Sequence, residues 1–399
     1  MSLLLIAILL GGFAWLAWRD LKLALMLIAC TMPIYLLRFD LLVPWTVLEA
    51  CILIAFGVWL MKHHDLRVAW KSLGVLRAPL ACLIIVATLA ILWAPDQLSA
   101  LGTWKAYFIE PLLVLVMLRT TLTQPEDWQK LLNGLGLSVI MIASIAILQK
   151  LTGLGLPIPW DTERRVTSVF EYPNAVGLYL APIVAALIIS KQKIAYVAVP
   201  LGLIAIYFAK TEAALVAIPA SVIFSLAIAN IKAKSRLVSL LLIAVLGVAT
   251  ALAIPSVRAK LFLQDYSGGV RRSQWTETLQ LLSDRPFQGA GLSGYPTALA
   301  PYHDSIVYEI FQYPHNLVLN FWVELGILGV IAGLWLGLIS LKLGWQGRDN
   351  LFALTALTAL VCMAVHGLVD VPFFKNDLSV LTAIFLAMLL ASNKLEQHS

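Results

Sequence analysis

Long apolar runs separated by short polar breaks extend along the whole chain. The stretches 80–93, 194–208 and 237–254 are apolar on every face and lack the two-residue alternation of a membrane-spanning strand. Runs of about twenty apolar residues form helices that cross the hydrocarbon core of a bilayer. We therefore predict an all-α fold, a multi-pass transmembrane helical bundle of 12–13 helices in one domain over residues 1–399. The predicted spans are 3–18, 21–37, 41–61, 73–94, 104–118, 131–150, 174–190, 194–209, 213–230, 236–254, 316–341, 350–370 and 377–392.

Composition excludes a soluble enzyme. Of the residues, 61% are hydrophobic and 13% are charged, with a mean hydropathy of +0.89, whereas about a quarter of the residues in soluble domains are charged. The formal net charge of +6 is typical of basic cytoplasmic loops and argues against a nucleic-acid partner. Neither a disulfide framework nor a zinc site is indicated, because no C-x-x-C spacing links the four cysteines, Cys30, Cys51, Cys82 and Cys362.

Positive charges gather in alternate loops, which sets the predicted orientation. We predict that the C-terminal tail is cytoplasmic, together with the loops that contain Lys62, Arg67, Lys71, Arg119, Lys130, Lys191, Lys193, Lys232, Lys234, Arg236, Lys342 and Arg348. The outward segments are then 38–40, 95–103, 151–173, the turn at Lys210, the long loop 255–315 and the turn 371–376.

Two outward loops nevertheless contain a surplus of basic residues. These are Arg164 and Arg165 in the shorter loop, and Arg258, Lys260, Arg271, Arg272 and Arg285 in the longer one. Long loops escape the charge rule, so chance is one explanation. The other explanation is an electropositive site for an anionic ligand, because arginine presents paired donors that match phosphate oxygens. Of two adjacent arginines, we expect at most one to contact such a ligand.

The segment that begins at Tyr313 is the most informative part of the sequence. Pro314 suits the first turn of a helix, which would place His315 at a helix start on the membrane boundary. The positive end of the helix dipole disfavours imidazolium, so we expect His315 to be neutral and able to accept a proton near neutral pH. Asn316, Asn320 and Glu324 follow at four-residue spacing, which predicts a polar stripe that either faces a cavity or bonds neighbouring helices together.

Other polar residues lie close to predicted outward helix ends. His366 and Asp370 are four residues apart, so we expect them to share a helix face, where they would either join a site or cap each other. Lys210, beside Glu212, is either a ligand contact or a cation paired with a neighbouring acid. The sequence contains no D-x-D pair, phosphate-loop, H-E-x-x-H or G-x-S-x-G motif, which removes support for metal-dependent sugar-nucleotide transfer, ATP-driven transport and serine hydrolysis.

These motifs resemble the O-antigen ligase and polymerase-like membrane glycosyltransferases, a superfamily with a GT-C-like fold. The resemblance rests on His315-Asn316 followed by Glu324-x-Gly326-x-x-Gly329, on Pro173-Asn174-x-x-Gly177 after the basic pair, on Arg271 and Arg272 with Trp275 ahead of Pro286-x-x-Gly289-x-Gly291, and on His366-x-x-x-Asp370. Members often have a Ser-Arg-Gly-like turn where this chain has Lys210-Thr211-Glu212. Lysine keeps the positive charge there but lacks the paired donors of arginine.

The resemblance implies a reaction and its participants. The donor would be a glycan on undecaprenyl diphosphate, and the acceptor a hydroxyl of lipid A–core at the periplasmic face of the bacterial inner membrane. His315 would act as general base or position the acceptor hydroxyl, with Asn316, Asn320, Glu324, His366 and Asp370 as supporting polar residues. The diphosphate would be held by Arg164, Arg165, Arg271, Arg272 and Lys210, with no metal and no cofactor. A repeat-unit polymerase of the same superfamily and, from a different class, a polysaccharide-lipid or small-anion transporter are the alternatives.

Overall fold

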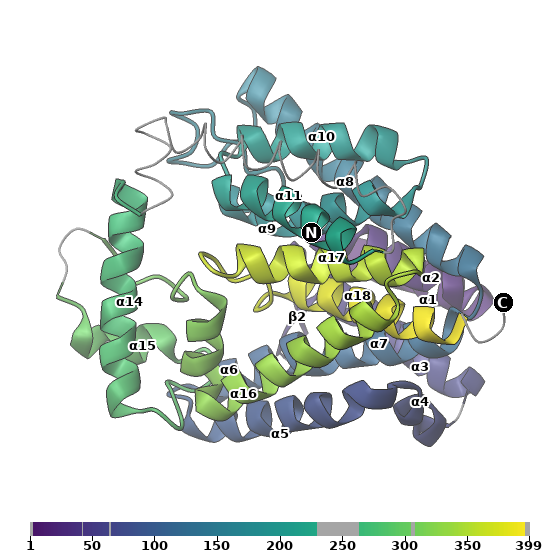
Figure 1. Cartoon of the computed structure of the whole chain (residues 1–399), viewed down its shortest axis with the longest axis horizontal. Helices are drawn as coiled ribbons and strands as arrows, with labels where there is room; N and C mark the ends of the chain where they lie inside the picture. The colour runs from purple at the N-terminus through teal and green to yellow at the C-terminus, as the bar shows by residue number, and fades with distance from the viewer. Residues whose placement is uncertain (1–2, 42, 64, 230–262, 305–307, 396–399) are drawn as a thin grey trace.

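The computed structural model describes residues 3–41, 43–63, 65–229, 263–304 and 308–395. Long apolar helices run side by side through most of the molecule, and one two-stranded antiparallel hairpin is present in the described part of the chain (Figure 1). This architecture confirms the predicted all-α, multi-pass membrane fold. The predicted span 236–254 lies outside the described residues, as do Lys232, Lys234, Arg236, Arg258 and Lys260.

The described elements follow in one order along the chain. The α-helices are α1 (Leu3–Arg19), α2 (Leu21–Cys30), α3 (Val47–His63), α4 (Leu66–Ser72), α5 (Arg77–Trp93), α6 (Gln97–Trp104), α7 (Glu110–Thr121), α8 (Pro125–Thr152), α9 (Pro173–Ser190), α10 (Ala195–Phe208), α11 (Glu212–Ile228), α14 (Tyr266–Asp284), α15 (Tyr295–Leu299), α16 (Leu317–Gln346), α17 (Leu351–His366) and α18 (Asn376–Leu395). The strands are β1 (Arg38–Leu41) and β2 (Val43–Thr46), and a π-helical turn, Lys105–Ile109, joins α6 to α7.

Among the described residues, five helical segments are long and apolar enough to cross a membrane as single continuous helices. They are Gly74–Trp93, Gln97–Thr121, Pro125–Thr152, Pro173–Ser190 and Leu317–Gln346. A sixth candidate consists of α3 and α4, which are bent by 113° relative to each other. The remaining apolar helices are shorter, with 10–17 residues each.

Two local predictions are wrong. The predicted span 41–61 begins too early, because residues up to Thr46 belong to the β-hairpin, in which Phe39 pairs with Trp45. The predicted loop 95–103 contains most of α6, whose N-cap Asp96 accepts hydrogen bonds from the backbone N–H groups of Leu98 and Ser99. A hydropathy pattern recognises neither a short hairpin nor a capped polar helix, since neither produces a long apolar run.

α9 is the most deeply buried of the spanning helices, with 89% of its residues inside the protein. It packs against α8, α10, α11 and α17. Small residues allow these close contacts: a side chain at Gly177 would collide with Thr211, and one at Gly202 with Val184. Close backbone approach is the usual basis of helix association in membranes, where the hydrophobic effect does not drive helices together.

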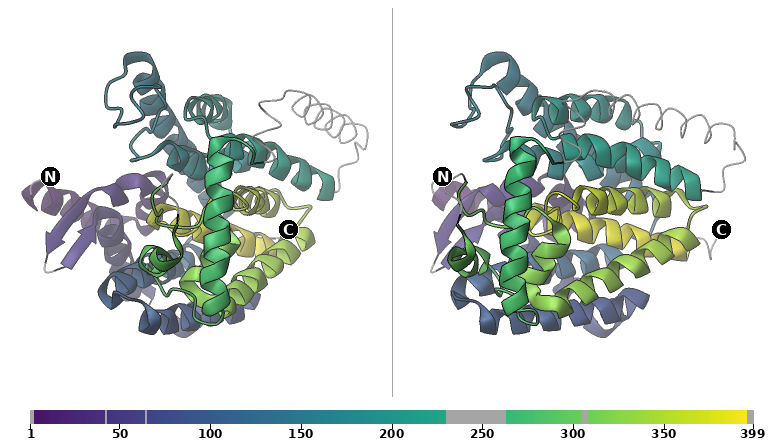
Figure 2. Two further views of the ribbon diagram at one scale, coloured as in Figure 1. Left: turned by 90° about the vertical axis from the view of Figure 1, so that its left-hand side faces the viewer. Right: turned by 60° about the vertical axis from the view of Figure 1, so that its left-hand side comes forward.

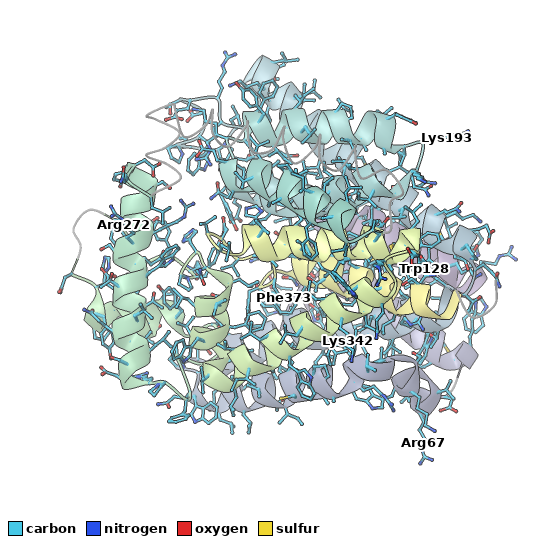
Figure 3. The ribbon with its side chains drawn as sticks, viewed as in Figure 1. Arg67, Trp128, Lys193, Arg272, Lys342 and Phe373 are labelled. Atoms are coloured by element: carbon cyan, nitrogen blue, oxygen red, sulfur yellow. The ribbon has the colours of Figure 1, made fainter. Side chains whose placement is uncertain are left out.

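α14 lies across one end of the bundle, roughly perpendicular to the long helices (Figures 1 and 2). It forms part of the segment 255–315, which the hydropathy pattern predicted only as a long loop. Arg272 on α14 lies at this end, whereas Arg67 and Lys193 lie at the opposite end (Figure 3). Arg272, from a predicted outward loop, is therefore separated in space from Arg67 and Lys193, which come from predicted cytoplasmic loops.

Candidate functional site

Four segments that are far apart in the sequence meet between α14 and the bundle. They are the basic loop before α9, helix α14, the segment before α16, and the turn after α17. Gln274 on α14 hydrogen-bonds His315, which lies before α16. Asn174 at the start of α9 bonds both Arg165 and Asp370, and Asn316 donates to the carbonyl of Leu368 in the turn after α17. The fold thus brings polar and ionisable residues from four distant segments into one candidate site.

His315 lies just before α16 and not in its first turn. Asn316 is the N-cap and its side chain accepts the backbone N–H of Leu319 at 3.0 Å. His315 has a left-handed backbone with φ of 48°, and the preceding carbonyl, that of Pro314, accepts the indole N–H of Trp275 at 2.7 Å. The prediction that Pro314 begins the helix is therefore wrong, because the capping side chain one residue after His315 sets the start.

Two hydrogen bonds of Gln274 on α14 determine the tautomer of His315. The Gln274 side-chain nitrogen donates to the carbonyl of Tyr313 at 2.9 Å, which fixes the orientation of the amide. Its oxygen then faces Nδ1 of His315 at 3.1 Å and can only accept. Nδ1 must therefore carry the hydrogen, which leaves Nε2 with a free lone pair.

The surroundings of His315 favour the neutral imidazole. Burial lowers the pKa of His315 below its ordinary value; the carboxylate of Asp370 opposes this shift, and the guanidinium of Arg271 adds to it. The direction agrees with the expectation from the sequence, but the main cause is burial and not the helix dipole. A neutral imidazole with a free Nε2 can accept a proton from a hydroxyl.

The structure distinguishes the two members of the arginine pair on α14. Arg271 is partly buried, and its Nε has no hydrogen-bond partner among the described residues. One contact of its guanidinium is long, from Nη1 to the Ser267 hydroxyl at 3.3 Å. Arg272 is exposed. The guanidinium of Arg271 therefore still has hydrogen-bond donors that a ligand could use.

The other arginine pair is distinguished in the same way. Arg165 is partly buried and donates from Nε to the carbonyl of Ala209 at 2.7 Å and from Nη2 to Oδ1 of Asn174 at 2.8 Å. Its guanidinium also lies over the ring of Trp160. Burial lowers the pKa of Arg165, and the nearby charge of Arg271 acts in the same direction. Arg164 is exposed.

Lys210 forms an exposed ion pair. Its side chain is 52% exposed and its ammonium lies 2.8 Å from the carboxylate of Glu163. The neighbouring-acid interpretation of Lys210 is thus supported, although the partner is Glu163 and not the adjacent Glu212. An exposed ion pair of this kind contributes little to stability.

His366 and Asp370 do not share a helix face, because α17 ends at His366. Asp370 follows in the turn and is 2% exposed, and His366 is 1% exposed. Both ring nitrogens of His366 are buried and have no hydrogen-bond partner in the described part of the chain. Asp370 accepts the backbone N–H of Val371 at 2.9 Å and the side-chain amide of Asn174 at 3.4 Å. The two residues therefore do not cap each other.

The predicted stripe on α16 separates into three different environments. Asn316 caps the helix and donates to the carbonyl of Leu368 at 2.9 Å. Asn320 is 1% exposed, and its side-chain oxygen has no partner within the described residues. Glu324 accepts the backbone N–H of Ser293 at 2.7 Å. Asn316 and Glu324 therefore connect α16 to neighbouring segments, which is the helix-bonding alternative.

Glycines of the segment 286–291 allow it to approach a break in α16. Gly326 has φ of 70° and ψ of −176° inside α16, and a side chain there would overlap the carbonyl of Phe287. A side chain at Gly289, whose φ is 62°, would meet the carbonyl of Val323. The backbone N–H of Ala290 donates to that same carbonyl at 2.6 Å. These glycines thus serve backbone packing beside Glu324.

An apolar cavity of about 200 Å³ lies among the helices of the bundle. Its lining includes Leu317, two residues after His315, and Met363, three residues before His366. From there it extends between α16, α17 and α18 to residues such as Leu341 and Leu386. The cavity is therefore an apolar space among these helices, and two of its lining residues lie close in sequence to His315 and His366.

Several residues of this site were not among the candidates identified from the sequence. Gln274 is one polar residue on a polar helix, and Tyr172, Tyr313 and Lys375 do not form a spacing pattern. Lys375 lies in the turn before α18, with its ammonium 4.4 Å from the centroid of the Tyr172 ring. These residues are identified as part of the site only by their contacts in the folded structure.

Part of the chain is similar to a known protein family. Residues 197–336 match the family model described as O-antigen ligase. This match covers less than half of the chain, and residues 197–336 are similar to the family over that region. The matched region includes Arg271, Gln274 and His315, and members of this family are glycosyltransferase-like enzymes of membranes. No curated protein matches the chain.

Proposed function

We propose that the protein is an O-antigen ligase that transfers a glycan from undecaprenyl diphosphate to a hydroxyl of lipid A–core at the periplasmic face of the inner membrane. The proposal is supported by the geometry of His315, whose Nδ1 faces the Gln274 oxygen and whose burial favours the neutral imidazole. It is also supported by Arg271, whose buried Nε has no hydrogen-bond partner among the described residues. In this orientation the long segment 255–315 is periplasmic and the C-terminus is cytoplasmic.

His315 is the general base of the proposed reaction. Nε2 takes the proton of the acceptor hydroxyl while the hydroxyl oxygen attacks the anomeric carbon of the donor sugar. The bond from that carbon to the diphosphate oxygen breaks, so that lipid diphosphate leaves and the anomeric configuration inverts. A base whose pKa lies near or below neutral pH remains unprotonated under these conditions, as this role requires.

Arg271 and Arg165 bind the diphosphate and stabilise the charge that accumulates on the leaving group. Arg271 supplies the direct contact through its unpaired donor, and Arg165 contributes positive charge from the α9 side. Donors already fixed in place need no rearrangement during the reaction, which makes such stabilisation effective. The apolar cavity beside Leu317 and Met363 receives the first part of the lipid chain.

The experiment is a transfer assay with the purified full-length chain in lipid nanodiscs. An undecaprenyl-diphosphate-linked oligosaccharide is the donor, and lipid A–core or a second molecule of the lipid-linked oligosaccharide is offered separately as acceptor. We expect transfer to lipid A–core and its loss in His315→Ala. The matched control is His303→Gln, because the ring nitrogens of His303 bond Glu277 and the carbonyl of Tyr308.

Three other outcomes of the transfer assay would contradict the proposal, each in a different way. Transfer only to the lipid-linked acceptor identifies a repeat-unit polymerase and contradicts the ligase assignment. Movement of the donor across vesicle membranes without any transfer identifies a transporter. Full activity in His315→Ala contradicts the catalytic assignment.

A further inference from the structure

The loop that follows α8 exposes two large apolar side chains. Leu154 is 76% exposed and Ile158 is 85% exposed, and both belong to the loop 153–165, which ends before the buried residue Val166. Contact of such side chains with water is unfavourable. The chain itself does not cover them, so the question is which surface outside the chain does.

The two side chains continue an apolar stripe on α8. Exposed apolar residues recur along this helix at spacings of three or four residues, which places them on one face. They are Leu137, Met141, Ile145, Leu148 and Leu151. Because α8 is long and apolar enough to cross a membrane, this exposed face contacts lipid. Leu154 follows the last residue of the stripe at the same spacing, so the loop extends a lipid-facing surface.

The length of α8 places the loop at the membrane boundary. No charged residue lies between Lys130 and Lys150. The helix over residues 131–151 is about 31 Å long, which matches the roughly 30 Å hydrocarbon core of a bilayer. The ammonium of Lys150 reaches past the helix end and donates to the carbonyl of Arg164 at 3.1 Å, as expected for a lysine at the edge of the hydrocarbon. The exposed loop side chains therefore follow where hydrocarbon meets head groups.

Gln149 in the last turn of α8 fixes the shape of the loop. It is 5% exposed, and its side-chain nitrogen donates to the carbonyls of Gly155 at 3.1 Å and Ser168 at 2.8 Å. Its oxygen accepts the backbone N–H groups of Thr167 at 3.1 Å and Ser168 at 2.7 Å. One buried amide thus joins the two ends of the loop, as in a compact surface loop with its ends held together. In Figure 2 the end of α8 and this loop project from the edge of the bundle.

We propose that the loop 153–165 is a membrane anchor whose Leu154 and Ile158 enter the lipid leaflet on the α14 side of the bilayer. The two halves of the loop differ as this position requires. The first half is apolar, whereas residues 161–164, Asp-Thr-Glu-Arg, are all exposed and suit the head groups and water. Trp160 lies between the halves, and tryptophan is enriched at membrane–water interfaces.

Trp160 also connects the anchor to Arg165. The guanidinium of Arg165 lies 5.1 Å from the centroid of the Trp160 ring, and its backbone N–H donates to the Trp160 carbonyl at 3.0 Å. Insertion of the loop therefore fixes the height of this guanidinium relative to the bilayer, at the level where the diphosphate of a membrane lipid lies. This consequence for the diphosphate rests on the proposed function, whereas the insertion itself does not.

The test measures the depth of the loop in the full-length protein, reconstituted at one chain per lipid nanodisc. Leu154→Cys and Ile158→Cys each carry an environment-sensitive NBD fluorophore, and the wild-type chain treated in the same way gives the background from its four cysteines. Lipids with brominated acyl chains quench a probe inside the leaflet, and iodide quenches a probe in water. We expect a loss of emission on the order of twofold with bromines about 5–10 Å below the head groups, and little effect of iodide.

Two further labelled positions calibrate the depth. Met141→Cys, on the lipid-facing stripe of α8, should respond to deeper bromines. Arg272→Cys, on the exposed face of α14 at the end of the bundle, should respond to iodide only (Figure 3). Iodide quenching of the loop probes to the extent seen at Arg272 overturns the proposal, because the loop then lies in water.

Protection of the loop probes from both quenchers also overturns the proposal, because a protein surface then covers the loop. If this protection arises only with two chains per nanodisc, the covering surface is a second copy of the chain. Since no transfer is measured, these outcomes are independent of the assay that tests the ligase assignment.

Discussion

Gln274 on α14 hydrogen-bonds Nδ1 of His315 at 3.1 Å across 41 residues of sequence. The second bond of Gln274, to the carbonyl of Tyr313, prevents the amide from turning over. Together these bonds fix the imidazole with its hydrogen on Nδ1. Helix α14, which lies across the end of the bundle, thus controls the protonation geometry of the proposed base (Figure 2).

Gln274→Ala should lower kcat because it removes the hydrogen bond that fixes the tautomer and orientation of His315. Without the bond the imidazole populates the other tautomer and other orientations, in which Nε2 cannot accept the hydroxyl proton. We expect a loss on the order of tenfold to a hundredfold in the transfer assay. The matched control is Gln280→Ala, an exposed glutamine on the same helix, which should retain activity. Equal activity of the two variants contradicts the role of Gln274.

The dependence of transfer on pH should follow the neutral form of His315. Burial lowers the pKa of His315, so activity should be lost only as the pH falls through a value below about 6.5, the ordinary value for histidine. Asp370 raises this pKa. Asp370→Asn should therefore move the acid limb of kcat/KM to still lower pH and decrease the plateau, because a weaker base accepts the proton less readily. An acid limb that moves to higher pH contradicts the assignment.

The two arginines on α14 should differ in their effects. Arg271→Ala removes the partly buried donor from the site, and we expect transfer to fall by about a hundredfold. Arg272→Ala changes an exposed side chain on the same helix and should retain nearly full activity (Figure 3). Arg271→Lys keeps the charge but not the paired donors, so it should be intermediate. Similar losses for both alanine variants indicate a general electrostatic effect of α14 instead of a specific contact.

The apolar runs predict most of the helices because burial in a bilayer requires them directly. Helix α9 and the predicted span 174–190 coincide almost completely. The pattern fails where other forces determine structure: capping by Asp96 creates α6, and strand pairing creates the hairpin that ends at Thr46. These features depend on single side chains or on hydrogen bonds between backbone segments, which hydropathy does not record.

The candidate site is predictable only in part for a similar reason. His315 and the arginine pairs stand out because ionisable residues are scarce in this chain, but their sequence does not reveal which arginine of each pair points inward. Gln274 and Lys375 acquire their significance from partners far along the chain. Such contacts follow from tertiary packing, so spacing along one helix cannot reveal them.

Gly326→Ala should strongly destabilise the protein. The backbone at Gly326 has φ of 70° within α16, and an added methyl group would overlap the carbonyl oxygen of Phe287. Relief of this overlap requires α16 and the segment 286–291 to separate, which also breaks the bond from Ala290 to Val323. We expect a loss of about 3 kcal/mol or more, seen as a lower temperature at which the purified protein loses its monodisperse peak in size-exclusion chromatography. Gly337→Ala on the same helix is the matched control, because a methyl group there meets no atom within 4 Å and should leave this temperature unchanged or higher. Equal thermal stability of the two variants contradicts a fixed backbone break at Gly326, and with it the close packing that joins Glu324 to Ser293 beside the site.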